Sequence, residues 1–83
     1  MSGGAPPFVG PVKRSITIAG HQTSISLEPA FWAALEAGAR ARGVPLSALV
    51  ARIDAARVEQ PAPPNLASAL RTWLLREVAS ASQ

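Results

Sequence analysis

The chain has 83 residues, enough for one small domain, and carries a formal net charge of +3 from eight basic and five acidic side chains. It contains no cysteine and one histidine, which excludes disulfide crosslinks, thiolate metal sites and multi-histidine metal sites, and leaves no nucleophile–base set for catalysis. We therefore expect a protein that is not an enzyme and uses no cofactor or metal.

The sequence predicts a cytoplasmic protein with a basic N-terminal third. No run approaches the ~20 apolar residues that cross a bilayer, and the first residues have neither the basic start nor the apolar run of a secretion signal. All five acidic residues follow position 27, whereas residues 1–27 carry Lys13 and Arg14. This distribution favours attraction of the N-terminal third to phosphate.

The first structured elements expected along the chain are two short strands. Residues 1–11 are rich in glycine and proline, lack periodicity and are predicted to form a flexible arm. Residues 12–18 and 22–27 each alternate in side-chain character with a period of two, as strands do. Gly20 can adopt a positive φ, so the two runs can form a hairpin within one chain. Alternatively, residues 22–27 form a lone strand that pairs with a second chain.

A helix is expected to follow the strands. Pro29 suits a first helical turn, and apolar residues recur at helical spacing until about Arg42, after which Gly43 ends the helix. Gly38 lies inside this helix, where glycine costs ~1 kcal/mol relative to alanine. It therefore indicates a close helix approach or a large neighbour, either Trp32 or Trp73.

Two further helices are expected beyond the Gly-Val-Pro turn. Ser47 is the predicted N-cap of the second helix, which ends near residue 58. Residues 59–64 are proline-rich and form a linker, and Asn65 is the predicted cap of a third helix that reaches about residue 79. We assign residues 12–58 to the core of the domain and expect residues 65–79 to cover a dimer core, either within one chain or across the two-fold axis.

Core burial predicts that the chain folds only as a homodimer. A strand followed by two helices is too small to enclose a core of its own, and a lone strand has unpaired edges. The residues expected to need a second chain for their burial are Ile25, Leu27, Leu35, Val50 and Ile53.

The order strand, helix, Gly-Val-Pro turn and helix resembles the ribbon-helix-helix family of bacterial DNA-binding proteins. Three motifs carry a closer resemblance, to a short alphaproteobacterial-type group of that family: Lys13-Arg14-Ser15, Gly20-His21-Gln22-Thr23-Ser24 and Leu27-Glu28-Pro29-Ala30-Phe31-Trp32. The resemblance implies a mainly α fold with a short β-ribbon. It further implies a ribbon-helix-helix dimer with an added N-terminal strand and an added C-terminal helix.

The same resemblance implies a transcriptional regulator that binds duplex DNA with sequence preference. In the family, alternate outward residues of the strand before the first helix read base edges, and these positions correspond to Gln22, Ser24 and Ser26. The start of the second helix clamps phosphate, which implicates Ser47 with the amides of Ala48 and Leu49. Lys13 and Arg14 are further candidate phosphate contacts. Structural roles alone are the alternative: a solvated sheet face, an N-cap and a solvated charge pair.

A second hypothesis is a sensor or a protein-interaction module, including an antitoxin-like role. If residues 12–18 pair beside residues 22–27, a dimer ribbon would have four strands, too broad to enter a groove as two strands do. A small anionic metabolite would then be the partner. Its candidate site is the turn, and the candidate residues are Lys13, Arg14, Gly20, His21 and Thr23.

Overall fold

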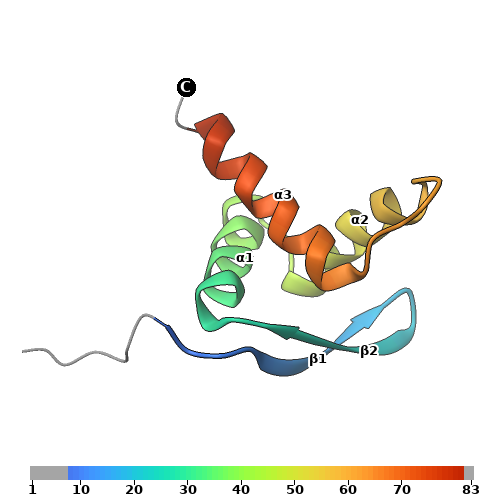
Figure 1. Ribbon diagram of the computed structural model, residues 1–83, viewed down its shortest axis with the longest axis horizontal. Helices are drawn as coiled ribbons and strands as arrows, with labels where there is room; N and C mark the ends of the chain where they lie inside the picture. Colours follow the sequence, from blue (N-terminus) through green and yellow to red (C-terminus); the bar gives the residue numbers. More distant parts are fainter. Residues whose placement is uncertain (1–7, 82–83) are drawn as a thin grey trace, which may run out of the picture.

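The computed structural model of the chain describes residues 8–81 and contains a two-stranded antiparallel sheet followed by three helices (Figure 1). The expected fold class is confirmed. The elements are β1 (Val12–Ile18), β2 (His21–Leu27), α1 (Pro29–Ala41), α2 (Leu46–Val58) and α3 (Leu66–Ala81). Most of the arm expected at residues 1–11 lies outside the described residues. Within residues 8–81, no helix combines the length and apolarity needed to cross a membrane.

The two strands form a hairpin within one chain. Ile18 pairs with His21, so the connection is a two-residue loop made of Ala19 and Gly20. Both loop residues have positive φ, 51° and 83° respectively. Positive φ at both central positions defines a type I′ turn, whose twist matches that of the flanking strands. Of the two alternatives left open by the sequence, the described chain therefore adopts the intrachain hairpin.

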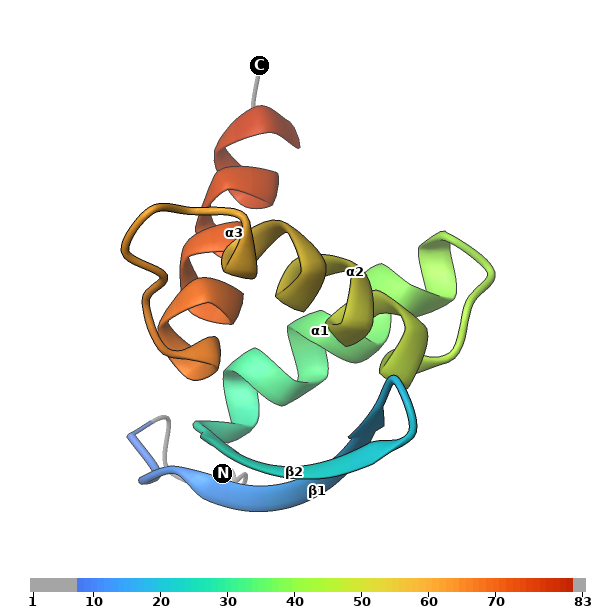
Figure 2. The ribbon, with the colours of Figure 1, turned by 90° about the vertical axis from the view of Figure 1, so that its right-hand side faces the viewer.

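The hairpin has one buried face, and all three helices lie on that side of it (Figure 2). Ile16 and Ile18 of β1 and Ile25 and Leu27 of β2 point inward and are buried. Helix α2 contacts β1, whereas α3 contacts β2. The period-two alternation of each strand thus places its apolar residues under the helices and its polar residues on the opposite, solvent-facing side.

Helix α1 ends in a hydrogen-bonded turn that requires glycine. Gly43 has φ of 67°, its N–H donates to the Arg40 carbonyl at 3.1 Å, and the Val44 N–H donates to the Ala39 carbonyl at 3.1 Å. This pair of hydrogen bonds is the Schellman motif. It redirects the chain into α2, which packs against α1.

The start of α2 differs from the sequence prediction. Ser47 is not the N-cap; Pro45 holds that position with extended backbone, and no side chain caps the helix. The Pro45 carbonyl accepts hydrogen bonds from the N–H groups of Ala48 and Leu49, at 3.0 and 3.2 Å. Proline is suited to this position because its φ is restricted near −65° and its missing N–H is not needed there. Ser47 therefore lies inside the first turn.

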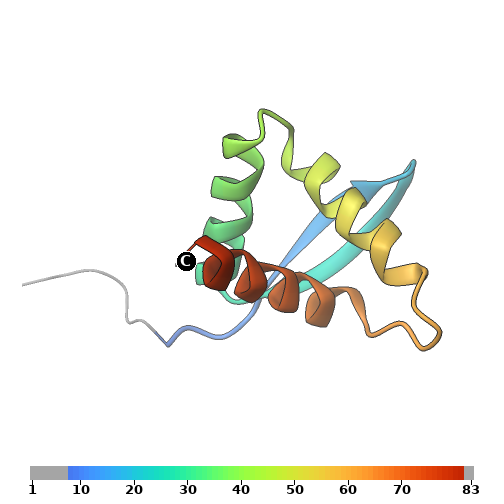
Figure 3. The same cartoon turned by 90° about the horizontal axis from the view of Figure 1, so that it is seen from above.

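The third helix begins as expected and runs farther than expected. The Ser68 N–H donates to Asn65 Oδ1 at 2.8 Å, which confirms Asn65 as the cap, and the helix continues to Ala81. Helices α2 and α3 are in contact and cross one another (Figure 2), and the proline-rich connection that joins them loops out at one end of the molecule (Figure 3). Leu70 and Leu74 of α3 are buried against the rest of the same chain.

The core closes within one chain, so the burial argument for an obligate dimer is wrong. Every residue that was expected to need a second chain is buried here, with exposed fractions of 6% or less. The reason is that two elements outside the strand–helix–helix unit supply the missing cover. Strand β1 contributes Ile16 and Ile18, and α3 contributes Leu70 and Leu74. Burial of these side chains therefore does not require a second chain.

Gly38 lies where α1 meets both neighbouring helices. A Cβ built at this position would lie 3.5 Å from Leu49 Cδ2 and 3.8 Å from Trp73 Cζ3. Of the two tryptophans proposed as its large neighbour, Trp73 is therefore the one in contact. These distances are ordinary van der Waals contacts, so the glycine is not sterically required.

Candidate nucleic-acid interface

The outward face of the hairpin is a continuous polar surface. Register pairs Thr17 with Gln22, Ser15 with Ser24 and Lys13 with Ser26, and all of these side chains are exposed. Hydroxyl, amide and ammonium groups therefore cover this face, and neither strand contains an acidic residue. We call this set of residues the outward ribbon face. It contains the three base-reading candidates expected in β2, together with Lys13.

Arg14 lies on the opposite side of the hairpin from Lys13. Its two terminal guanidinium nitrogens, Nη1 and Nη2, each lie 3.3 Å from Glu36 Oε2, and the guanidinium stacks over the Trp32 ring at 4.6 Å from the ring centre. Alternation along β1 places this side chain toward α1 with the buried isoleucines. The guanidinium therefore joins β1 to α1, and Lys13 is the cation that the two strands present on the outward ribbon face.

Further contacts hold the hairpin rigidly against the helices. The Trp32 indole Nε1–H donates to the Val12 carbonyl at 2.9 Å, which attaches the start of β1 to α1. At the other strand, Arg71 of α3 donates to Glu28 Oε1 at 3.1 and 3.2 Å and stacks over Phe31. These contacts attach the start of β1 and the end of β2 to the helices that cover the inward face of the hairpin.

The pKa of Glu28 is lowered from its ordinary value. The largest cause is a hydrogen bond from its own backbone N–H, followed by an opposing contribution from desolvation. Hydrogen bonding to Arg71 and the positive charge of Arg71 then lower the pKa further. The lowered pKa favours the ionised carboxylate, which accepts hydrogen bonds from Arg71 at the junction of β2, α1 and α3.

The start of α2 presents free backbone donors, but not the ones expected from the sequence. The amides of Ala48 and Leu49 are hydrogen-bonded to the Pro45 carbonyl. With Pro45 as the N-cap and no side-chain cap, the N–H groups of Leu46 and Ser47 have no partner within the helix. A helix N-terminus of this kind carries partial positive charge and binds phosphate oxygens well.

The residues proposed for an anion site at the turn do not come together. Gly20 and His21 lie at the exposed turn, whereas Arg14 and Lys13 lie toward the other end of β1, about 13 and 17 Å away at ~3.3 Å per strand residue. Thr23 is half-buried on the inward face. Strand register thus separates the proposed donors, and the structure gives no support to this cluster as a binding site.

Sequence reasoning missed two members of the outward ribbon face. Ser15 and Thr17 lie opposite Ser24 and Gln22. The sequence shows that these two residues alternate with the isoleucines of β1. Whether they share a surface with the polar residues of β2, however, depends on the register of the hairpin. A two-residue turn at Ala19 and Gly20 was the signal that would have supplied that register.

No group of three or more histidine, cysteine, aspartate or glutamate side chains that could hold a metal ion is present in residues 8–81. The hydrogen-bonding and positive groups described above lie at the outward ribbon face and at the start of α2.

Comparison with known proteins identifies the family. A family described as "Ribbon-helix-helix domain" matches residues 11–78, which covers both strands and nearly all of the three helices. Neither the search of curated proteins nor the search of solved structures found a match. The chain belongs to the ribbon-helix-helix family, whose domains typically bind DNA as dimers and are generally non-catalytic.

Proposed function

We propose that this ribbon-helix-helix protein is a homodimeric transcriptional regulator that binds duplex DNA, with sequence preference, through the outward ribbon face. The observation that carries the proposal is the composition of that face: exposed polar side chains on two paired strands, without an acidic residue. Such a surface is compatible with both base edges and phosphates. Membership of a family of DNA-binding dimers supports the same function.

The dimensions of the hairpin suit the major groove. A two-stranded ribbon fits into this groove, whereas four strands side by side are too broad. Because one chain already supplies both strands, each hairpin can enter a groove without strands from a partner. In the proposed dimer, each chain therefore reads its own half-site. Half-sites about 34 Å apart, one helical turn of DNA, would present the same groove to both hairpins.

Chemistry assigns different roles to residues on the outward ribbon face. Gln22 can form a bidentate pair with adenine, and hydroxyl groups such as that of Ser24 can donate to or accept from any base. Lys13 can contact guanine or phosphate. The free N–H groups at Leu46 and Ser47 supply backbone contacts to phosphate that carry no sequence information.

Selection of sites from a randomised duplex library, followed by affinity measurements over a range of salt concentrations, tests the proposal. The full chain should enrich a defined sequence. The double variant Gln22→Ala/Ser24→Ala should reduce discrimination against mismatched sites by roughly 1–3 kcal/mol per lost bidentate contact, with little change in non-specific binding. The variant Lys13→Gln should weaken binding to all sequences and reduce the salt slope by about 1 if the lysine contacts phosphate.

A matched control keeps the test specific. The double variant Gln60→Ala/Thr72→Ala removes the same kinds of group from exposed positions on the α2–α3 side of the molecule. It should bind DNA like the parent chain. If the two double variants lose affinity equally, or if the ribbon variant loses the same affinity on every sequence, base reading by the ribbon is wrong.

A further inference from the structure

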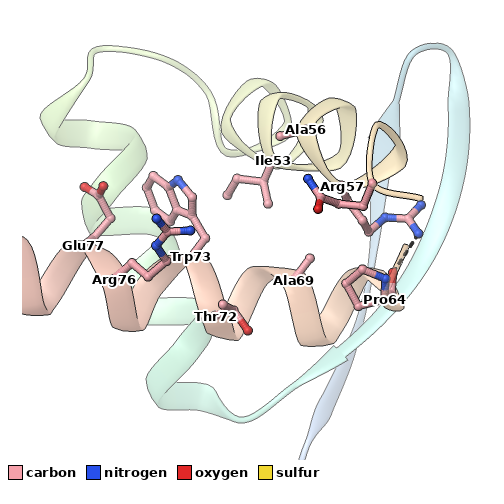
Figure 4. A pocket seen from close by; sticks show the side chains of 10 residues that line it. Ile53, Ala56, Arg57, Pro64, Ala69, Thr72, Trp73, Arg76 and Glu77 are labelled. Atoms are coloured by element: carbon pink, nitrogen blue, oxygen red, sulfur yellow. Dashed lines mark hydrogen bonds between the residues drawn. The ribbon is translucent and has the colours of Figure 1, made fainter. Parts of the chain in front are cut away.

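A cleft between α2 and α3 lies apart from the outward ribbon face. Its volume is about 480 Å³, within the range of ligand pockets in proteins. Residues of both helices and of their connection line it, and Ile53 and Trp73 point into the space between the two helices (Figure 4). No part of the proposed DNA contact lies among its lining residues.

The middle of the cleft is apolar. Ile53 and Ala56 contribute from α2, and Ala69 and Trp73 contribute from α3. Ile53 is buried and Trp73 is half-buried, so the indole is held in place while part of it lines the cleft. An aromatic side chain beside aliphatic ones favours the flat apolar body of a ligand.

The charged groups of the cleft leave one positive charge without a partner. Arg57 is bound to Asp54, at 2.8 Å, and to the Pro64 carbonyl, at 2.9 Å. The Glu77 carboxylate forms an ion pair with Arg42, the residue that follows α1, at 2.6 Å. In contrast, the Arg76 guanidinium has no ion pair or hydrogen bond with any residue from 8 to 81, and the side chain lies beside Trp73 at the cleft (Figure 4).

We propose that this cleft binds a small organic monoanion with a planar apolar body, such as an aromatic carboxylate. The carboxylate pairs with Arg76, and the body lies against Trp73 and Ile53. Arg76 is the one unpaired cation among the described lining residues, so the cleft favours a ligand with one negative charge over a ligand with two. The other charged residues that line it, Arg57 and Glu77, are already in ion pairs.

Titration of the ¹⁵N-labelled full chain with benzoate and with 2-naphthoate, followed by NMR, tests the site. Both probes should shift the Trp73 indole N–H signal and the amide signals of Ala69 and Thr72. The neutral isostere benzamide should bind about fivefold more weakly than benzoate, the effect expected when an exposed ion pair is lost.

Substitution at the free cation should separate the carboxylate contact from apolar binding. Arg76→Gln should weaken benzoate about fivefold and leave benzamide unchanged. Arg40→Gln is the matched control, since Arg40 is an exposed arginine on α1 that does not line the cleft. It should leave both affinities unchanged. The spectrum of each variant without ligand shows whether it is folded.

Several results would overturn the proposal. Failure of both carboxylates to shift the Trp73 signal would do so, as would equal affinities for benzoate and benzamide or an unchanged benzoate affinity in Arg76→Gln. Cleft signals that move with protein concentration and not with ligand would assign the cleft to a second copy of the chain instead. None of these results depends on DNA binding, so the site and the proposed function stand or fall separately.

Discussion

Replacement of Leu70 by alanine tests whether α3 closes the core within one chain. Leu70 is completely buried, whereas Leu75, on the same helix, is 70% exposed. Leu70→Ala removes three carbon atoms, which costs about 2.4 kcal/mol at ~0.8 kcal/mol per buried methylene. The cavity that remains raises the cost to roughly 2.5–5 kcal/mol. The control Leu75→Ala should cost less than about 0.5 kcal/mol, as exposed substitutions do.

The expected loss is a large part of the total stability. A domain of this length has a free energy of unfolding on the order of 4–12 kcal/mol. Leu70→Ala should therefore lower Tm by roughly 10 °C or more. Urea unfolding followed by circular dichroism, at equal protein concentrations, measures both variants. A cost below about 1 kcal/mol for Leu70→Ala, or equal costs for the two variants, would refute the assignment of α3 to the core of its own chain.

Three other predictions concern single contacts. Gly38→Ala should stabilise the chain by up to about 1 kcal/mol, because the added methyl group meets only ordinary van der Waals contacts and alanine favours the helix. Gly43→Ala should destabilise the chain by about 1–2 kcal/mol, because residue 43 has a φ of 67°. Thermal unfolding measures both effects. Trp32→Phe should cost about 1–3 kcal/mol and speed hydrogen exchange in β1, because a strand carbonyl loses its donor. The pKa of Glu28 is lowered in the folded chain, so its contribution to stability should be complete above about pH 4.3 and be lost as the pH falls through the lowered pKa. In Glu28→Gln, this part of the acid dependence of the unfolding free energy should disappear from urea titrations at a series of pH values. An unchanged dependence on pH would contradict the stabilising role of the Glu28 carboxylate.

The order of elements and the faces of the strands could be predicted from the sequence because both are local properties. Alternation along residues 12–18 and 22–27 correctly separated Ile16 and Ile25, which are buried, from Lys13 and Ser24, which are exposed. The cap at Asn65 was predictable for the same reason: its side chain bonds an amide three residues away.

The errors arose where the outcome depends on distant parts of the chain or on competing local signals. The phosphate role of Arg14 stays a prediction, but its pairing with Glu36 could not be foreseen, because the two residues are 22 positions apart and only the packing of α1 on β1 brings them together. The burial argument omitted the cover supplied by α3. At α2, the serine signature for an N-cap competed with Pro45, and the backbone restriction of proline decided the helix start.

The candidate site was only partly predictable for a related reason. Gln22, Ser24 and Ser26 followed from alternation in one strand, whereas Ser15 and Thr17 required the register of the hairpin. The cleft between α2 and α3 could not be predicted, because it depends on how two helices lie relative to one another.

Titration of the ¹⁵N-labelled chain with its selected DNA duplex tests the proposed interface most directly. We expect the largest NMR shifts at amides of β1 and β2 whose side chains lie on the outward ribbon face, with a second group at Leu46 and Ser47. Residues that line the α2–α3 cleft should shift little. Large shifts confined to α3, with the hairpin signals unchanged, would contradict DNA recognition by the ribbon.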